Sequence, residues 1–311
     1  MTETNTNTVT VYAPATVANM VCGFDVLGFA LDGPFDKMVI TKTDKKGVEI
    51  INKDNYNLPT DADNNIIGVA LQSLLKEVDG DVGFRVESTK VIKPGSGIGS
   101  SAASAAGAVV GANALLNNKF SQQELIEFAL DGEELASKSR HADNIAPCLL
   151  GGVVLIRSMQ PLDIVEIPSP ELHVTIVHPQ IEVKTSESRG MLKSEVALKD
   201  AVTQWANVGS LVAGLIKNDA ELIGRSLQDV IVEPIRSILI PEFDKIKAES
   251  LKAGAIGGGI SGSGPSVFML SKDASTAKAV EQAIKKVYQD VDFEYHTHTT
   301  TISNKGVRVE L

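Results

Sequence analysis

Short apolar runs and one amphipathic helix make up the pattern of the first part of the chain. Residues 9–13, 37–43 and 82–91 carry apolar blocks or alternating apolar and polar positions, which predict β-strands, and residues 47–52 are a further candidate. Apolar residues then recur at helical spacing and predict a helix with Asp63 as its N-cap. This stripe consists of Ile66, Ile67, Ala70, Leu71, Leu74, Leu75 and Val78. Core packing accounts for the whole stripe.

The middle of the chain continues with helices, a strand and a proline-rich stretch. A glycine-rich loop leads into an alanine-rich helical segment, and Ser121 with Glu124 forms a capping box that predicts the start of the next helix. Residues 151–157 are typical of a buried strand. Three prolines fall between residues 160 and 170. We therefore expect a domain boundary there, with domains over residues 1–160 and 161–311.

The second half mixes strands and helices in no regular order. Strands are predicted over residues 172–178, 267–270, 293–299 and 307–311, and helices over residues 194–217, 220–230, 242–252 and 274–289. This order favours an α+β domain over a repeated parallel-sheet unit.

Composition narrows the class of protein. The 311 residues are enough for two domains, and 43% apolar with 22% charged residues is ordinary for a globular protein. A net charge of -10 argues against a general nucleic-acid binder. The sequence shows no signal peptide and no apolar run long enough to span a membrane, so we expect a cytoplasmic protein. Cys22 and Cys148 are expected to be buried free thiols.

The loop from Pro94 to Ser104 is the clearest candidate for chemistry. Glycines at 95, 97 and 99 allow tight turns, and the following helix would aim unpaired N–H groups at an anion such as a phosphate. A Walker A loop would need a lysine where Ser100 stands, and the spacing does not fit a dinucleotide fingerprint. On this loop alone, a structural turn with Ser100 or Ser101 as helix N-cap explains the pattern equally well.

A second glycine cluster covers residues 257–266. It satisfies the G-x-G-x-x-G spacing, but a proline and a strand-like run follow it instead of a helix, which excludes a dinucleotide site. Five glycines and three serines in ten residues are costly to order, which favours a role facing a ligand over a simple turn.

Three segments together carry a family resemblance. Residues 12–28, with Ala18-Asn19 and Gly23-Phe24-Asp25, stand in order with the two glycine loops, and the trio resembles the three motifs of the GHMP kinases. The first motif looks most like that of the homoserine kinases in this superfamily. The strings at residues 140–147, 185–189 and 233–236 agree, so the resemblance covers nearly the whole chain.

The resemblance implies an α+β, two-domain GHMP kinase fold. The N-terminal domain would be like domain 2 of ribosomal protein S5 and the C-terminal domain ferredoxin-like, with the active site between them and a homodimer as the assembly. The first glycine loop would wrap the phosphates of ATP, with Asn64 and Asn65 near the adenosine. The loop residues are Pro94, Gly95, Ser96, Gly97, Ile98, Gly99, Ser100, Ser101, Ala102, Ala103 and Ser104. Ser101 or Ser100, together with Glu133, would hold Mg²⁺.

The acceptor side of the site follows from the same resemblance and from the chemistry of homoserine. Guanidinium groups of Arg189 and Arg236 suit its carboxylate, while Asn19, Asp25 and Asp143 can accept its ammonium and hydroxyl protons. His141 and Thr185 are expected to join them. Taken singly, Asn19 and Asp25 could be turn residues and His141 a core histidine.

Asn144 stands beside Asp143 and bears on the mechanism. An amide is not a useful base, so we expect in-line transfer to the homoserine hydroxyl without a strong dedicated base, with Asp143, Asn144 and Arg189 as the catalytic residues. A GHMP kinase for another small alcohol, such as a mevalonate-pathway intermediate, and a catalytically inactive nucleotide-binding regulator remain the alternatives.

Overall fold

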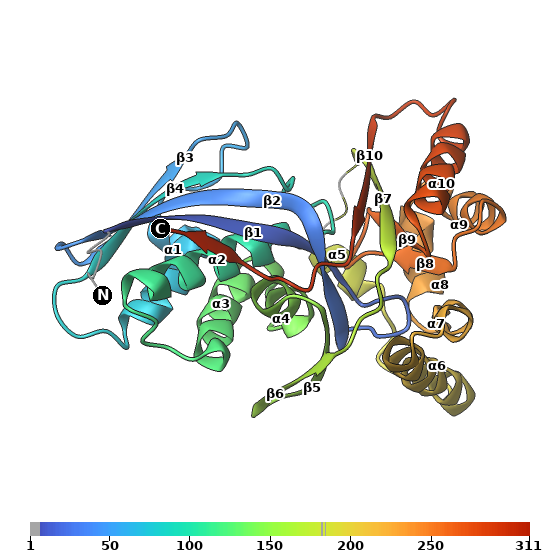
Figure 1. The fold of residues 1–311 in the computed structure, drawn as a ribbon, viewed down its shortest axis with the longest axis horizontal. Helices are drawn as coiled ribbons and strands as arrows, with labels where there is room; N and C mark the ends of the chain where they lie inside the picture. Colours follow the sequence, from blue (N-terminus) through green and yellow to red (C-terminus); the bar gives the residue numbers. More distant parts are fainter. Residues whose placement is uncertain (1–6, 182, 184) are drawn as a thin grey trace.

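Two β-sheets, each covered by helices, make up the fold (Figure 1). The structure is a computed structural model, and it describes residues 7–181, 183 and 185–311. The strands are β1 Thr8–Ala18, β2 Leu27–Thr43, β3 Gly47–Asn52, β4 Gly83–Thr89, β5 Val153–Met159, β6 Leu162–Ile167, β7 His173–Pro179, β8 Gly257–Ile260, β9 Val267–Ser271, β10 Tyr295–Thr301 and β11 Arg308–Glu310. The α-helices are α1 Ile66–Leu75, α2 Ser100–Leu115, α3 Gln122–Ser137, α4 Ala142–Leu150, α5 Thr185–Gly190, α6 Leu198–Lys217, α7 Ala220–Ser226, α8 Glu233–Arg236, α9 Phe243–Lys252 and α10 Ala274–Val287. Two short 3₁₀ turns cover Ala62–Asn64 and Ser237–Leu239.

The first sheet is built around the long strand β2. Its strand order is β11-β1-β2-β4-β3, and β5 joins the other end of β2 and carries β6 at its edge. The β3–β4 pair is parallel and the remaining pairs are antiparallel. Figure 1 shows α1 to α4 gathered on one face of this sheet.

Helix α2 lies at the centre of that layer and is buried on almost every side. Its small residues allow this, because a Cβ at Gly107 would come within 3.0 Å of Ala13 and one at Gly111 within 2.5 Å of Val11. Both contacts are with β1, so the helix can lie close against the strand. The alanine-rich sequence after the glycine loop therefore serves close packing.

The second sheet has the order β10-β7-β9-β8, with every pair antiparallel. Helices α9 and α10 pack on it, and their apolar residues form a second core with Val267 and Met269 of β9. The predicted α+β character of this half is confirmed.

The chain returns to the first sheet after β10. Ser303 donates to the carbonyl of Ala30, Val307 donates to that of Cys148, and β11 pairs with β1. Strand β6 also belongs to the first sheet, although it follows residue 160. The domain division at residues 160 and 161 stays a prediction, and the strand pairing shows that the sheets do not separate at one point of the sequence.

Most predicted elements are present, with three corrections at helix starts. Helix α6 begins at Leu198 and not at residue 194. The capping box of Ser121 and Glu124 is confirmed. The predicted cap Asp63 is wrong. The N-cap of α1 is Asn65, whose side chain accepts the N–H of Ile67, and the helix begins at Ile66. The N-cap of α2 is Gly99, with neither Ser100 nor Ser101 in that position. Both cysteines are buried and free, as expected. In the part of the chain described, no helix is long and apolar enough to cross a membrane.

Candidate active site

A cavity of about 450 Å³ lies where the loops of the two sheets meet. The first glycine loop and the N-terminus of α2 form one side, and segments 18–25, 141–144 and 262–263 form much of the rest. Leu58 and Ile66 add an apolar part to the lining. The residues that contribute charge are Asp25, Lys90, Glu133, His141, Asp143, Arg189 and Arg236.

The first glycine loop has the backbone that its sequence requires. Gly95, Gly97 and Gly99 have φ values of 76°, 81° and 73°, in the region that favours glycine. The loop runs directly into α2, whose first turn has N–H groups without helical partners. This geometry can bind an anion such as a phosphate.

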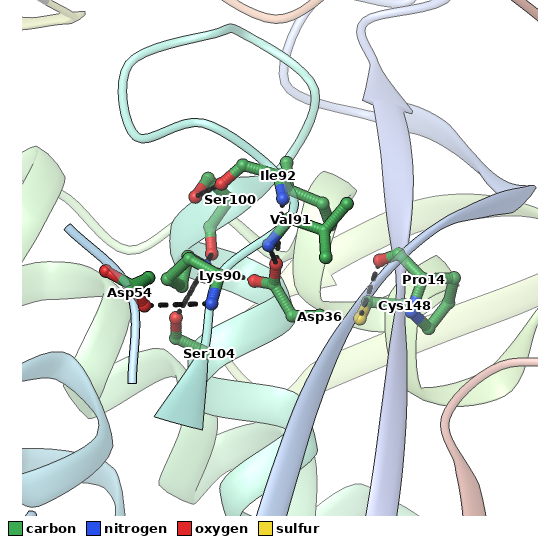
Figure 2. Close-up of polar contacts among 9 residues, drawn as sticks. All are labelled: Pro14, Asp36, Asp54, Lys90, Val91, Ile92, Ser100, Ser104 and Cys148. Atoms are coloured by element: carbon green, nitrogen blue, oxygen red, sulfur yellow. Dashed lines mark hydrogen bonds and ion pairs between the residues drawn. The ribbon is translucent and has the colours of Figure 1, made fainter. Parts of the chain in front are cut away.

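A buried ion pair ties the two ends of this loop together (Figure 2). Asp36 accepts the N–H groups of Val91 and Ile92 at 2.8 and 2.9 Å and pairs with the ammonium group of Lys90. Lys90 also donates to the carbonyl of Ser100 at 2.7 Å and to the hydroxyl of Ser104 at 2.9 Å. Its three N–H donors are thus used within the protein, which favours an anchoring role.

Ser100 belongs to the same anchor. Its hydroxyl donates to the carbonyl of Ile92 at 2.8 Å and is buried. Of the two serines expected at the metal, Ser101 is the better candidate, because its hydroxyl bonds to Glu133, the other expected ligand, whereas that of Ser100 bonds to a backbone carbonyl. Sequence patterns missed the Asp36–Lys90 pair, because two charged residues 54 positions apart carry no local signal.

The second glycine cluster docks on the first. Ser261 donates to the carbonyl of Gly97 at 2.7 Å, and Ser266 donates to that of Ser96 at 2.6 Å. The fit is close, since a Cβ at Gly97 would lie 2.5 Å from the carbonyl oxygen of Gly264. Serine hydroxyls of the second glycine cluster thus bond to the backbone of the first glycine loop and support it.

The hydroxyl of Ser101 and the carboxyl group of Glu133 bring oxygen atoms to the lining of the cavity. Burial raises the pKa of Glu133 to about 7, and a hydrogen bond from Ser101 and the charge of Lys90 partly oppose this shift. Among the residues described, no group of three His, Cys, Asp or Glu side chains could hold a metal by itself. A hydroxyl and a carboxylate suit a hard cation that takes its other ligands from phosphate and water.

The side chain of Asn19 links the second glycine cluster to the segment that carries Asp25. Its Nδ2 donates to the carbonyl of Gly262 at 2.7 Å, and its Oδ1 accepts the N–H of Asp25 at 3.0 Å. Asn19 and Asp25 both have positive φ values, 73° and 61°. The turn role considered from the sequence therefore applies to Asn19, which also lines the cavity.

Two guanidinium groups converge beside Asp25. Nη2 of Arg189 lies 2.8 and 3.0 Å from the two carboxylate oxygens of Asp25. Arg236 is only 3% exposed, and burial, followed by the charge of Arg189, lowers its pKa. The site thus concentrates positive charge that can bind a carboxylate.

Helix α4 supplies three polar side chains. His141 is its N-cap residue, and burial lowers its pKa while Asp25 opposes the shift. Burial, with Asp25 and Glu133, raises the pKa of Asp143 to about 7. Asn144 accepts a hydrogen bond from Thr16 at its Oδ1, over 2.7 Å. No helix is predicted from the sequence at α4, because Pro147 inside it obscures the helical pattern.

Most of the predicted site residues meet at this one cavity. Asn64 does not line it, because it lies on an exposed 3₁₀ turn and donates to Asp61. Asn65 is occupied in capping α1. Ser96, Ile98, Ala102 and Ala103 are loop and helix residues behind the lining. Thr185 begins α5, but its side chain lies outside the part of the chain that the structure describes.

Comparison with known proteins gives a consistent result. The family model for the N-terminal domain of GHMP kinases matches residues 64–152, and that for the C-terminal domain matches residues 211–290. A homoserine kinase of Chloroherpeton thalassium is 44% identical over 97% of this chain and 99% of its own length. One from Xylella fastidiosa is 38% identical over 96% and 92%.

Solved structures agree at the level of the fold. The crystal structure of homoserine kinase from Cytophaga hutchinsonii has a TM-score of 0.95 and 48% identity, and the match covers 100% of this chain and 99% of that one. A mevalonate kinase of L. major, at 15% identity, has a TM-score of 0.73 over 95% of this chain and 96% of its own, and shows the fold alone. The expected two-domain fold is confirmed.

Proposed function

The chain belongs to the homoserine kinases of the GHMP kinase family, and from this we propose that its cavity transfers the γ-phosphoryl group of ATP to the side-chain hydroxyl of L-homoserine. The product is O-phospho-L-homoserine, an intermediate of threonine biosynthesis. The observation that carries the proposal is one cavity with a glycine-rich anion loop on one side and two guanidinium groups with two carboxyl groups on the other.

The anion loop supports the placement of the ATP phosphates. Its three left-handed glycines and the N-terminus of α2 present backbone N–H groups, and the Asp36–Lys90 pair fixes both ends of the loop. A preorganised loop stabilises the charge that develops on the transferred phosphoryl group.

The opposite side supports the placement of homoserine. Arg189 and Arg236 offer forked donors for its carboxylate. Asp25, Asp143 and Asn19 lie in the same lining of the cavity. His141 and, from the resemblance, Thr185 complete the proposed set. Asp25 is already paired with Arg189, but a substrate without an amino group would leave the buried carboxyl group of Asp143 without an ammonium partner, which argues against a mevalonate-pathway alcohol.

Mg²⁺ fits the donor set of Ser101 and Glu133. Both atoms are oxygens, and Mg²⁺ keeps several ligands from water and phosphate, so two protein ligands suffice. Bound there, the ion would neutralise negative charge on the phosphate oxygens. Glu133→Gln should require a higher Mg²⁺ concentration for half-maximal activity, and an unchanged Mg²⁺ titration would remove Glu133 from this role.

Transfer without a strong dedicated base is supported by the two residues at the start of α4. Asn144 uses its Oδ1 for Thr16, which leaves the amide a donor to the substrate. Burial raises the pKa of Asp143, but an ammonium group beside it would favour the charged carboxylate as its partner. We propose that Asp143 and Asn144 orient the acceptor, and that its proton leaves late in the transfer.

Release of ADP with a panel of acceptors tests the function. The purified chain, Mg²⁺ and ATP are combined with L-homoserine, L-serine, L-threonine or mevalonate, and kcat/KM is measured for each. We expect homoserine to be preferred over each of the others. Preference for mevalonate would favour the other-alcohol alternative, and no turnover with any acceptor would favour a nucleotide-binding regulator.

The assembly and the location of the protein are further proposals. We propose a homodimer, as the family resemblance suggests, and a cytoplasmic location, as expected from the sequence. Sedimentation equilibrium would test the assembly, and a monomer at micromolar concentration would contradict it.

A further inference from the structure

The ring of Phe24 contacts both guanidinium groups of the site. The guanidinium carbon of Arg189 lies 5.2 Å from the ring centroid and that of Arg236 lies 5.0 Å from it. Both distances are within the range of a cation–π interaction. One aromatic ring therefore links two arginines that come from α5 and α8, far apart in the sequence.

The two guanidinium groups carry like charges, so their close approach requires compensating interactions. Like charges repel, and the charge of Arg189 lowers the pKa of Arg236. Asp25 takes up the charge of Arg189, whereas Arg236 has a long contact of 3.4 Å with the carbonyl of Gly262. Nε of both arginines is buried without a hydrogen-bond partner among the described residues. The face of an aromatic ring carries partial negative charge and can offset this repulsion.

The loop that carries Phe24 is held firmly. Asn19 accepts the N–H of Asp25 and donates to the carbonyl of Gly262, which fixes the residue that follows the ring. The carbonyl of Gly23, the residue before the ring, accepts the N–H groups of Val26 and Leu27 at 3.0 and 2.9 Å. A ring on such a loop can set the positions of side chains packed against it.

We propose that Phe24 is a positioning residue whose π-face fixes the spacing of Arg189 and Arg236, so that the two guanidinium groups are preorganised for the carboxylate of the acceptor. This inference rests on the proposed function of the cavity. It assigns Phe24 an electrostatic role, which a space-filling apolar side chain of the same volume could not perform. Preorganised charges bind a ligand more tightly because less ordering is needed on binding.

Graded fluorination of Phe24 separates charge from shape. Phenylalanine with one, two or three ring fluorines at position 24 keeps nearly the same volume while the π-face becomes progressively less negative. We expect the KM for homoserine to rise with each fluorine, to roughly tenfold for the trifluoro ring, with the KM for ATP unchanged.

Phe35 provides a matched control. Its ring also contacts an arginine, Arg308, at 4.7 Å, and that arginine does not line the cavity, unlike Arg189 and Arg236. The same fluorine series at position 35 should leave the KM for homoserine unchanged. A rise there as large as that at position 24 would overturn the inference.

The outcomes also distinguish this inference from the proposed function. The unmodified enzyme is assayed first, and failure to phosphorylate homoserine would contradict the function itself. If it does phosphorylate homoserine but the KM is flat across the fluorine series at position 24, only the role of Phe24 is overturned. Phe24→Tyr, which keeps the aromatic face, should retain the KM for homoserine, whereas Phe24→Leu should raise it; equal values for the two would overturn the inference.

Discussion

Asp143 is a carboxyl group set among other charged groups and only 4% exposed. Burial raises its pKa from 3.8 to about 7, and Asp25 and Glu133 add to the shift. The folded state thus holds this proton over a pH range in which the unfolded chain has released it. Stability from this group is present below pH 4 and is lost as the pH rises toward 7.

Asp143→Asn should remove this pH dependence. The asparagine has no proton to lose, so the difference in unfolding free energy between variant and parent should grow in favour of the variant as the pH rises from 4 to 7. Urea unfolding of both proteins without ligands at several pH values measures it. A difference that stays constant over this range would show that the carboxyl group titrates normally in the folded state.

The same variant tests the proposed role of Asp143 in the reaction. If Asp143 orients the acceptor and is not a general base, Asp143→Asn should raise the KM for homoserine and lower kcat by less than about tenfold. Loss of a true general base typically costs about 10²–10⁴ in rate. A fall of that size, with a loss of the pH dependence of kcat, would identify Asp143 as the base.

At the scale of single residues, the sequence predicts the functional side chains that lie within recognisable motifs. It misses the side chains whose role depends on a partner far away in the chain. Motifs and chemistry predict Asn19, Asp25, Arg189 and Arg236 as site residues, and all four line the cavity. Asp36 and Lys90 were missed, because their pairing depends on how β2 and the end of β4 come together. Asn64 was placed near the ligand from the resemblance, and its exposed 3₁₀ position gives no support for that role.

At the scale of elements, the contact between the two glycine loops can be tested by its contribution to stability. Gly97 touches the backbone of Gly264 and Ser261, whereas a Cβ at Gly95 would meet nothing within 4 Å. Both have φ near 80°, so an alanine is similarly strained at either position. The pair therefore separates backbone strain from contact between the loops.

Gly97→Ala should destabilise the protein more than Gly95→Ala. Each substitution costs about 1–2 kcal/mol in left-handed strain, and Gly97→Ala adds about 1–3 kcal/mol because its Cβ would force the loops apart. Chemical denaturation of both variants gives the two free energies of unfolding. Equal losses would mean that the loops are not in close contact in solution.

Sequence patterns predicted elements well where one face alone is buried. The stripe from Ile66 to Val78 and the capping box at Ser121 gave α1 and α3, although the cap of α1 is Asn65. Strand β8 was missed because its residues 257–260 include three glycines, which strands usually avoid. Its pairing with β9 and close packing on neighbouring backbone override that preference.

On the scale of the whole molecule, the two sheets meet at the reaction cavity. The first sheet supplies the anion loop and α4, and the second half supplies Arg189, Arg236 and the serines that support the loop. Sequence patterns alone predicted strands and helices in both halves but could not place the halves relative to each other, because contacts such as Asn19 with Gly262 span 243 residues. The family resemblance supplied that arrangement, and the structure has it.

The KM values of Arg236→Ala for its two substrates test the central claim most directly. If the cavity holds ATP on the loop side and homoserine on the arginine side, the KM for homoserine should rise by roughly ten- to a hundredfold, the value of one charge-assisted hydrogen bond. The KM for ATP should stay within about threefold of the parent value. An equal rise in both values, or no change in the KM for homoserine, would contradict the account.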